Sequence, residues 1–170
     1  MPLSKEIKEI LEEHVHRLIR DHPRTNDKGP FGYKRAFIRE WVIRYGLANF
    51  SNPMHKYRLS ADDRVLLYCE CNMPMHLQDN IIILKKRNSY IKQEISKLFK
   101  KNTTVLDFVC GPATACLALA DQFRNKKFYY YGIDKAEPML NKAKLIWDAA
   151  VESSLIDIPQ VTYFVPLIAA

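Results

Sequence analysis

The sequence has 170 residues, of which 48% are hydrophobic and 26% are charged, and its formal net charge is +7. These proportions are ordinary for a globular protein, and the length allows one sizeable hydrophobic core. No apolar run approaches the ~18 residues of a membrane span. Residues 1–22 lack the apolar core of a secretory signal and contain acidic residues that transit peptides avoid. We therefore expect a cytoplasmic protein without a membrane segment.

The positive charge is concentrated in the first part of the chain. Residues 1–100 contain 19 Lys and Arg against 12 Asp and Glu, whereas residues 101–170 contain 7 of each. This asymmetry is consistent with an anionic partner, most often RNA or DNA, and equally with a surface that serves solubility alone.

Residues 1–100 are predicted to be a basic helical region. Apolar residues recur at helical spacing over residues 4–20, with Ser4 as a plausible N-cap. Residues 22–32 form a loop rich in Pro, Gly and Asn. The next segment, "YKRAFIREWVIRYG", predicts a helix that ends at Gly46. Its inward stripe comprises Phe37, Ile38, Trp41, Val42 and Tyr45.

Two further helices are predicted in this region. The sequence "SADD" at residues 60–63 matches a capping box before an apolar run. Pro74 interrupts the pattern, and residues 76–100 predict a longer helix. Its inward residues would be Leu84, Ile91, Ile95 and Leu98.

The pattern changes at residue 103. Residues 103–108, 128–133 and 161–165 are short, apolar and rich in β-branched or aromatic residues, and helical patterns lie between them. This alternation predicts an α/β fold: the first half of a Rossmann-like parallel sheet, preceded by the helical region. We place the division between a helical region, 1–100, and a partial Rossmann-like domain, 101–170.

The loop after the first strand predicts a nucleotide-like cofactor. The loop has a single glycine, Gly111, whereas dinucleotide sites need three. Asp107 stands at the end of the strand, where its negative charge would repel the pyrophosphate of a dinucleotide. S-adenosylmethionine has no phosphate. Its amino group suits Asp107, and its ribose suits Asp134 at the end of the second strand. Alternatively, Asp107 binds nearby backbone and Asp134 caps the following helix.

The segments "VLDFVCGPATACLALA" and "YYGIDKAEPMLNKAK" resemble the first two motifs of class I S-adenosylmethionine-dependent methyltransferases. The resemblance covers roughly residues 103–165. It implies in-line transfer of a methyl group, with S-adenosylmethionine as cofactor and RNA or DNA among the candidate acceptors. No catalytic base is indicated. The cofactor-binding residues that it implies are Asp107, Phe108, Val109, Cys110, Gly111, Asp134, Lys135 and Met139.

The sequence departs from that family at two levels. Val109 replaces the first glycine, and a β-branched side chain disfavours positive φ and adds bulk near the methionine moiety. We expect weak cofactor binding, tighter binding in Val109→Gly, and slightly earlier melting of that variant. Only three of the family's seven strands are present, so we expect a longer protein or a protein partner that completes the sheet.

Other interpretations remain open. The chain could be a non-catalytic methyltransferase-like module that binds a protein or a nucleic acid, or a dinucleotide-binding protein. Tyr68, Asn72 and His76 could cover the cofactor or pack at a helix end. The four cysteines are expected to be reduced and to bind no metal, because their spacing lacks the CxxC pairs of structural zinc sites.

Overall fold

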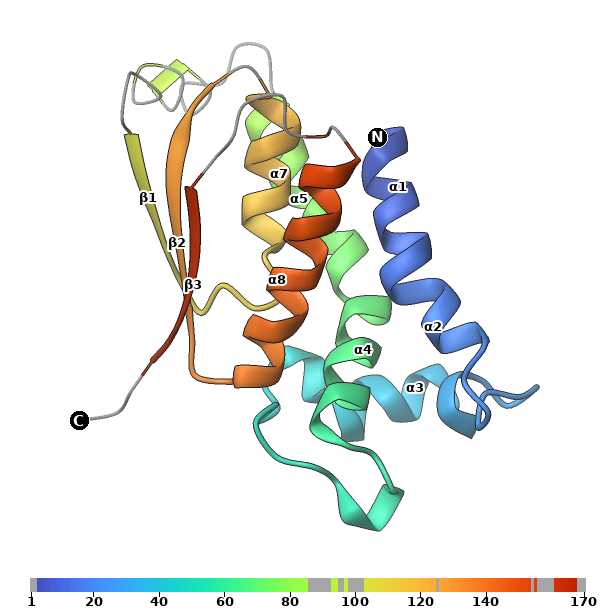
Figure 1. The fold of residues 1–170 in the computed structure, drawn as a ribbon. Helices are drawn as coiled ribbons and strands as arrows, with labels where there is room; N and C mark the ends of the chain where they lie inside the picture. Colours follow the sequence, from blue (N-terminus) through green and yellow to red (C-terminus); the bar gives the residue numbers. More distant parts are fainter. Residues whose placement is uncertain are drawn as a thin grey trace.

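The computed structural model describes residues 3–85, 93–94, 97, 103–124, 126–153, 155 and 161–167. A three-stranded parallel sheet lies on one side of the molecule, and helices lie on the other (Figure 1). The strands follow the order of the sequence: β1 Thr103–Phe108, β2 Phe128–Asp134 and β3 Val161–Pro166. The predicted α/β class, the N-terminal helices and the three parallel strands are therefore confirmed.

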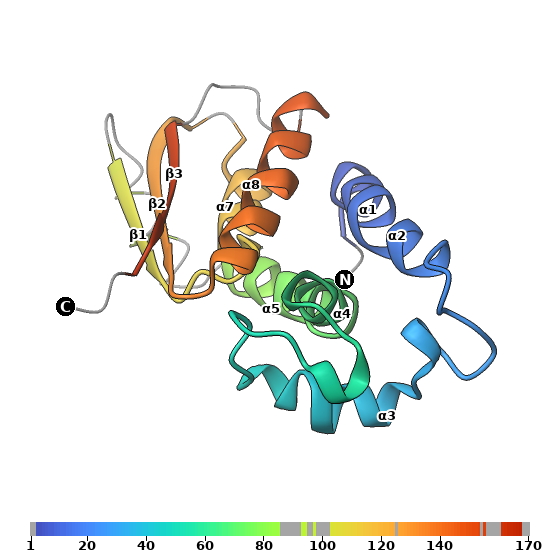
Figure 2. The ribbon, with the colours of Figure 1, turned by 60° about the horizontal axis from the view of Figure 1, so that its bottom comes forward.

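Two helices connect the strands and cover one face of the sheet. They are α7, Thr114–Gln122, and α8, Glu137–Glu152. Both lie on the same side in Figures 1 and 2, as expected when successive parallel strands are joined by right-handed crossovers. Alternate residues of β2 are therefore buried, beginning with Phe128 and Tyr130.

The opposite side of the sheet, here called the open face, is not covered by any helix that the structure describes (Figure 2). It is nevertheless apolar. Leu106 and Phe108 are 54% and 63% exposed, and Tyr131 stacks on Tyr163 with ring centroids 4.9 Å apart. A parallel sheet normally has both faces buried, so this face is unusual.

The N-terminal region is helical, as predicted. Over residues 3–85 the structure describes one continuous helix with a π-helical turn, five short helical elements and two longer helices. Their bounds are α1 Lys5–Leu11, η1 Glu12–His16, α2 Arg17–Arg20, η2 Pro30–Gly32, α3 Arg35–Phe37, η3 Ile38–Val42, η4 Arg44–Gly46, η5 His55–Tyr57, α4 Ala61–Cys71 and α5 Met73–Lys85.

The two predicted N-caps differ in their hydrogen bonds. Ser4 occupies the N-cap of α1, but its side chain forms no capping hydrogen bond. At α4 the capping box is complete: the Asp63 N–H donates to Ser60 Oγ over 3.0 Å, and the Ser60 N–H donates to Asp63 Oδ2 over 2.8 Å.

The predicted apolar stripe of residues 33–46 is partly wrong. Ile38 and Val42 are buried, but Trp41 and Tyr45 are 55% and 70% exposed. The Ile43 N–H donates to the Ile38 carbonyl, five residues back, and this wider turn shifts the phase of the stripe. At the end of the segment the backbone turns left-handed, which carries Tyr45 outward.

The predicted break near Pro74 is confirmed, because Asn72 separates α4 from α5. Leu84 is buried in α5 as expected. Ile91, Ile95 and Leu98 lie outside the described residues.

Both predicted parts of the chain contribute to one hydrophobic cluster, which extends from Ile7 to Leu155. Within it α5 packs on α7, while α1 and α4 pack on α8. The helical region therefore forms a second layer over the helices of the sheet. None of the helices in the described part of the chain combines the length and the apolar composition needed to cross a membrane.

Candidate functional site

The loop between β1 and α7 begins the candidate site. Val109, Gly111 and Ala113 have φ of 61°, 53° and 61°, so the chain alternates through the left-handed region before α7 begins. The Cys110 N–H donates to the Ile133 carbonyl over 3.0 Å, which keeps the loop against the end of β2. A β-branched residue in this region is a conformational outlier, and Val109 is such a residue.

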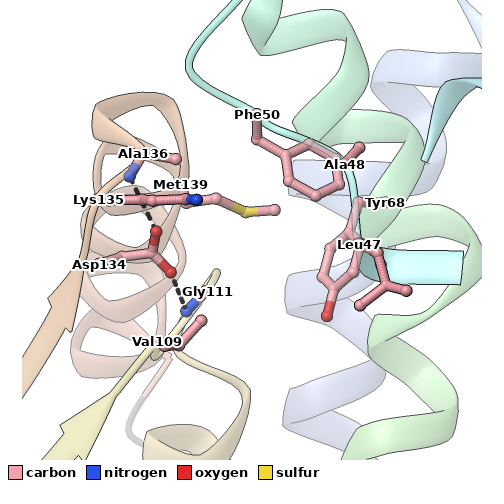
Figure 3. A pocket seen from close by; sticks show the side chains of 11 residues that line it. Leu47, Ala48, Phe50, Tyr68, Val109, Gly111, Asp134, Lys135, Ala136 and Met139 are labelled. Atoms are coloured by element: carbon pink, nitrogen blue, oxygen red, sulfur yellow. Dashed lines mark hydrogen bonds between the residues drawn. The ribbon is translucent and has the colours of Figure 1, made fainter. Parts of the chain in front are cut away.

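Asp134 fixes this loop to the start of α8. Its Oδ2 accepts the Gly111 N–H over 3.0 Å, and its Oδ1 accepts the Ala136 N–H over 2.9 Å (Figure 3). Asp134 is buried, with only 6% of the residue exposed. Asp134 thus holds the backbone just before α8, but among the described residues no side chain forms a capping hydrogen bond to α8 itself. Each carboxylate oxygen can accept a second hydrogen bond, so a ribose contact remains a prediction.

Asp107 lies on the helix-covered side of the sheet, half-buried at the end of β1. It accepts a hydrogen bond from the hydroxyl of buried Tyr130. Burial raises the pKa of Asp107, the hydrogen bond from Tyr130 lowers it, and the negative charge of Asp134 raises it again. The two carboxylates are thus close enough to influence each other, and together they make this crevice unfavourable for a phosphate group.

A first cavity, of about 270 Å³, opens between this loop and the helical layer. Figure 3 shows Asp134, Lys135 and Met139 on one side and residues of the helical layer on the other. The lining residues are Gly46, Leu47, Ala48, Phe50, Tyr68, Val109, Gly111, Asp134, Lys135, Ala136 and Met139. Five of the eight residues implied by the methyltransferase resemblance therefore line one cavity.

A second cavity, of about 260 Å³, lies beside the first. Its lining residues are Tyr68, His76, Asn80, Asp107, Val109, Cys110, Gly111, Pro112, Thr114 and Ala115. The two cavities share Tyr68, Val109 and Gly111. Each is slightly smaller than the ~300–1,000 Å³ typical of small-molecule pockets. A cofactor of nucleoside size would therefore need both cavities. Val109, which is 80% exposed, lies where the two cavities meet.

Phe108 is not brought to this site. It points to the open face of the sheet and lines neither cavity. The strand alternation that turns Asp107 toward the helices turns the next residue away from them. Cys110, by contrast, is buried and lines the second cavity.

Residues 46–50 complete the first cavity and were not predicted from the sequence. Arg64 of α4 anchors this segment: Nη1 donates to the carbonyls of Asn49 and Asn52 over 2.7 and 2.5 Å, and Nη2 to that of Val42 over 3.1 Å. Arg64 is 5% exposed, and burial lowers its pKa. In the sequence, the only indication of these contacts was an arginine, Arg64, directly before an apolar run.

Tyr68, Asn72 and His76 were considered as residues that could cover the cofactor, and two of them line the first or the second cavity. Tyr68 lines both, and burial raises its pKa. His76 lines the second cavity. Asn72 lines neither.

The cysteines show no sign of metal binding or activation. All four are free, and burial raises the pKa of Cys69 and of Cys110 to about 12. Within the described residues, no group of three or more His, Cys, Asp or Glu side chains could hold a metal ion.

Comparisons with protein-family models, curated proteins and solved structures found no match.

Proposed function

We propose that the crevice at the carboxyl ends of β1 and β2 binds S-adenosylmethionine and that the protein is a methyltransferase. The observation that carries this proposal is the pair of adjoining cavities on either side of Gly111, each with an acidic residue at a strand end. Ligands of open α/β sheets bind at this edge. The four free cysteines fit the reducing cytoplasm, which is part of the proposal.

The residues present suit the chemical groups of this cofactor. The first cavity offers Leu47, Phe50 and Met139 as an apolar wall for a purine, with Asp134 beside it as a hydrogen-bond acceptor for ribose. The second offers Asp107 for an ammonium group. A Cβ at Gly111 would have no heavy atom within 4 Å, so the space beside this backbone is open to a ligand.

A dinucleotide fits less well. Its pyrophosphate would approach Asp107 and Asp134, and the loop offers one glycine where dinucleotide loops use three. The negative charge of the crevice and the missing glycines both favour a cofactor without phosphate.

In the proposed reaction a methyl group passes from the sulfonium to a nucleophilic acceptor, which loses a proton, and the sulfonium becomes a thioether. The contribution of this chain would be to hold the two reactants in line. RNA or DNA is the acceptor class that the basic N-terminal region favours.

The test is calorimetric titration of the protein with S-adenosylmethionine and with NAD, in wild type, Val109→Ala and Val109→Gly. We expect S-adenosylmethionine to bind and NAD not to bind, with affinity rising from valine to alanine to glycine. If the volume of the Val109 side chain alone limits affinity, Val109→Ala gives most of the increase in affinity. If the left-handed backbone conformation limits it, only Val109→Gly increases the affinity. Binding of NAD in preference to S-adenosylmethionine would refute the proposal.

The open face of the sheet favours a second candidate, a non-catalytic module that binds a protein partner. Leu106, Phe108 and Val165 are exposed there, and contiguous exposed apolar side chains mark interaction sites. In the titration above, no heat with either cofactor in any of the three proteins would favour this candidate.

A further inference from the structure

A third cavity, of about 220 Å³, lies between the segment that ends in η4 and the junction of α4 and α5. Its lining residues are Arg39, Tyr45, Cys71, Asn72, Met75 and His76. His76 also lines the second cavity, which contains Asp107. The third cavity therefore adjoins the candidate cofactor crevice but is outside it.

The side chain of Asn72 points to a polar ligand in this cavity. Asn72 is only 8% exposed, yet its side-chain amide has no hydrogen-bond partner among the described residues. Although the residue is buried, its amide oxygen and nitrogen both keep surface that solvent can reach. One acceptor and two donors are available to a molecule that enters the cavity, and the edge of a nucleobase presents complementary groups.

Tyr45 supplies an exposed aromatic ring at the same cavity. Arg44, Tyr45 and Gly46 have φ of 46°, 53° and 91°, and these consecutive left-handed residues hold the Tyr45 side chain 70% exposed. Strained backbone of this kind is concentrated at ligand-contact sites. The segment also passes close to Asn72: a Cβ on Gly46 would lie 3.6 Å from the Asn72 amide nitrogen.

Two exposed cations belong to the same segment: Arg39 lines the cavity, and Arg44 directly precedes Tyr45 in the sequence. Arg39 and Arg44 are exposed and form no ion pair within the described part of the chain, whereas Arg35 on the same segment is paired with Glu70 over 2.8 Å. Unpaired guanidinium groups suit phosphate oxygens. A base-sized cavity, an exposed ring and exposed cations are the elements of single-strand recognition.

We propose that this third cavity receives one unpaired nucleobase of a single-stranded nucleic acid. The base stacks on Tyr45 and hydrogen-bonds to Asn72, and its flanking phosphates contact Arg39 and Arg44. A duplex cannot use the cavity, because its bases are stacked and paired. This proposal rests on the proposed function in one respect. The bound base would be the methyl acceptor, and it would reach the cofactor crevice beside His76, which lines both the second and the third cavity.

The test is fluorescence anisotropy with short labelled oligonucleotides and no cofactor. The probes are a single-stranded RNA, a DNA of the same sequence, an abasic strand of equal length and a duplex. We expect the base-bearing strands to bind more tightly than the abasic strand and the duplex. The RNA and DNA arms identify the preferred sugar.

Substitutions of single residues distinguish contacts to the base from contacts to the phosphates, because only the first kind is lost in the abasic strand. Tyr45→Ala and Asn72→Ala should each weaken binding of the base-bearing strand at least about fivefold and leave the abasic strand unaffected. Arg44→Gln should weaken both strands. Lys28→Gln, which removes an exposed cation from the loop before η2, is the matched control and should not alter the preference for bases.

Equal affinity for the abasic and the base-bearing strand, or unchanged affinity in a folded Tyr45→Ala variant, would overturn the proposal. Tyr45 is exposed, so its variant remains informative even if Asn72→Ala fails to fold. Because the assay contains no cofactor, its failure is distinct from failure of S-adenosylmethionine binding, which the calorimetric titration measures separately.

Discussion

Val109 is the residue at which the conformation of the site and its proposed chemistry conflict. At φ of 61° a β-branched residue is strained by roughly 1–3 kcal/mol. Glycine adopts this conformation freely but loses about 0.5–1 kcal/mol of chain entropy. The structure therefore reverses the expectation, drawn from the sequence, that Val109→Gly melts earlier.

We expect Val109→Gly to raise the free energy of unfolding by about 1 kcal/mol, because relief of strain exceeds the added chain entropy. Urea unfolding of the apo protein measures this change. Val109→Ala is the control, since alanine keeps the Cβ that makes the left-handed region unfavourable, and it should gain less. A loss of stability in the glycine variant would show that the loop is not left-handed at this position in solution.

At Gly132 a glycine is required because neighbouring side chains leave no space for a Cβ atom. A Cβ at this position would lie 2.9 Å from both the Sγ of Cys110 and the Cδ1 of Phe164. Gly132→Ala should lower the free energy of unfolding by about 1–3 kcal/mol, the usual cost of overpacking. Gly111→Ala provides the comparison, because it meets no atom within 4 Å and adds only backbone strain. Equal stability of Gly132→Ala and wild type in urea unfolding would mean that β3 does not pack here.

Among the elements, α4 depends on its capping box. The Ser60 side chain satisfies the N–H of Asp63, which has no partner inside the helix. Ser60→Ala should cost about 0.5–2 kcal/mol of unfolding free energy by thermal or urea denaturation. Ser4→Ala is the control at α1, where no capping bond forms, and it should cost less. A similar loss in both variants would show that the bond at Ser60 contributes nothing specific.

The regular elements were predictable because their signals are local. The capping box, the break before Pro74 and the three apolar strands follow from propensity and short-range pattern. Trp41 and Tyr45 were not predictable, because a π-helical turn and a left-handed turn alter the helical phase without a sequence signature. Periodicity alone therefore placed two exposed aromatic side chains in the core.

The candidate site was predictable only in the half supplied by the sheet. Asp107 and Asp134 stand at strand ends and Gly111 in the loop after β1, where topology brings them together. The other wall, residues 46–50, comes from the helical region, and its position depends on Arg64 and on the packing of α4 against α8. Tertiary contacts of this kind leave no short-range pattern in the sequence.

At the scale of the whole molecule, an ion pair joins the first helix to the turn that follows α7. Arg124 donates to both oxygens of Glu6 over 2.9 and 3.2 Å. Hydrogen bonding to Arg124 lowers the pKa of Glu6 from 4.5 to about 2. A lowered folded-state pKa stabilises the fold fully above pH ~4.5, and this contribution is lost as the pH falls toward 2.

Glu6→Gln should therefore reduce stability at neutral pH and make unfolding less pH-dependent between pH ~4.5 and 2. Urea unfolding at several pH values measures both effects. Glu9→Gln is the control on the same helix, because the Glu9 pair with Lys5 is exposed and long, at 3.6 Å. Parallel pH profiles for Glu6→Gln and wild type would show that the pair does not form in solution.

We propose above all that the crevice between the sheet and the helical layer binds S-adenosylmethionine. Amide hydrogen exchange with and without saturating S-adenosylmethionine tests it most directly, because it locates the ligand. We expect slower exchange in residues 109–113 and 46–50, the two walls of the first cavity, with α1 unchanged and NAD without effect. Unchanged exchange in both walls, or the same protection with NAD, would contradict the claim.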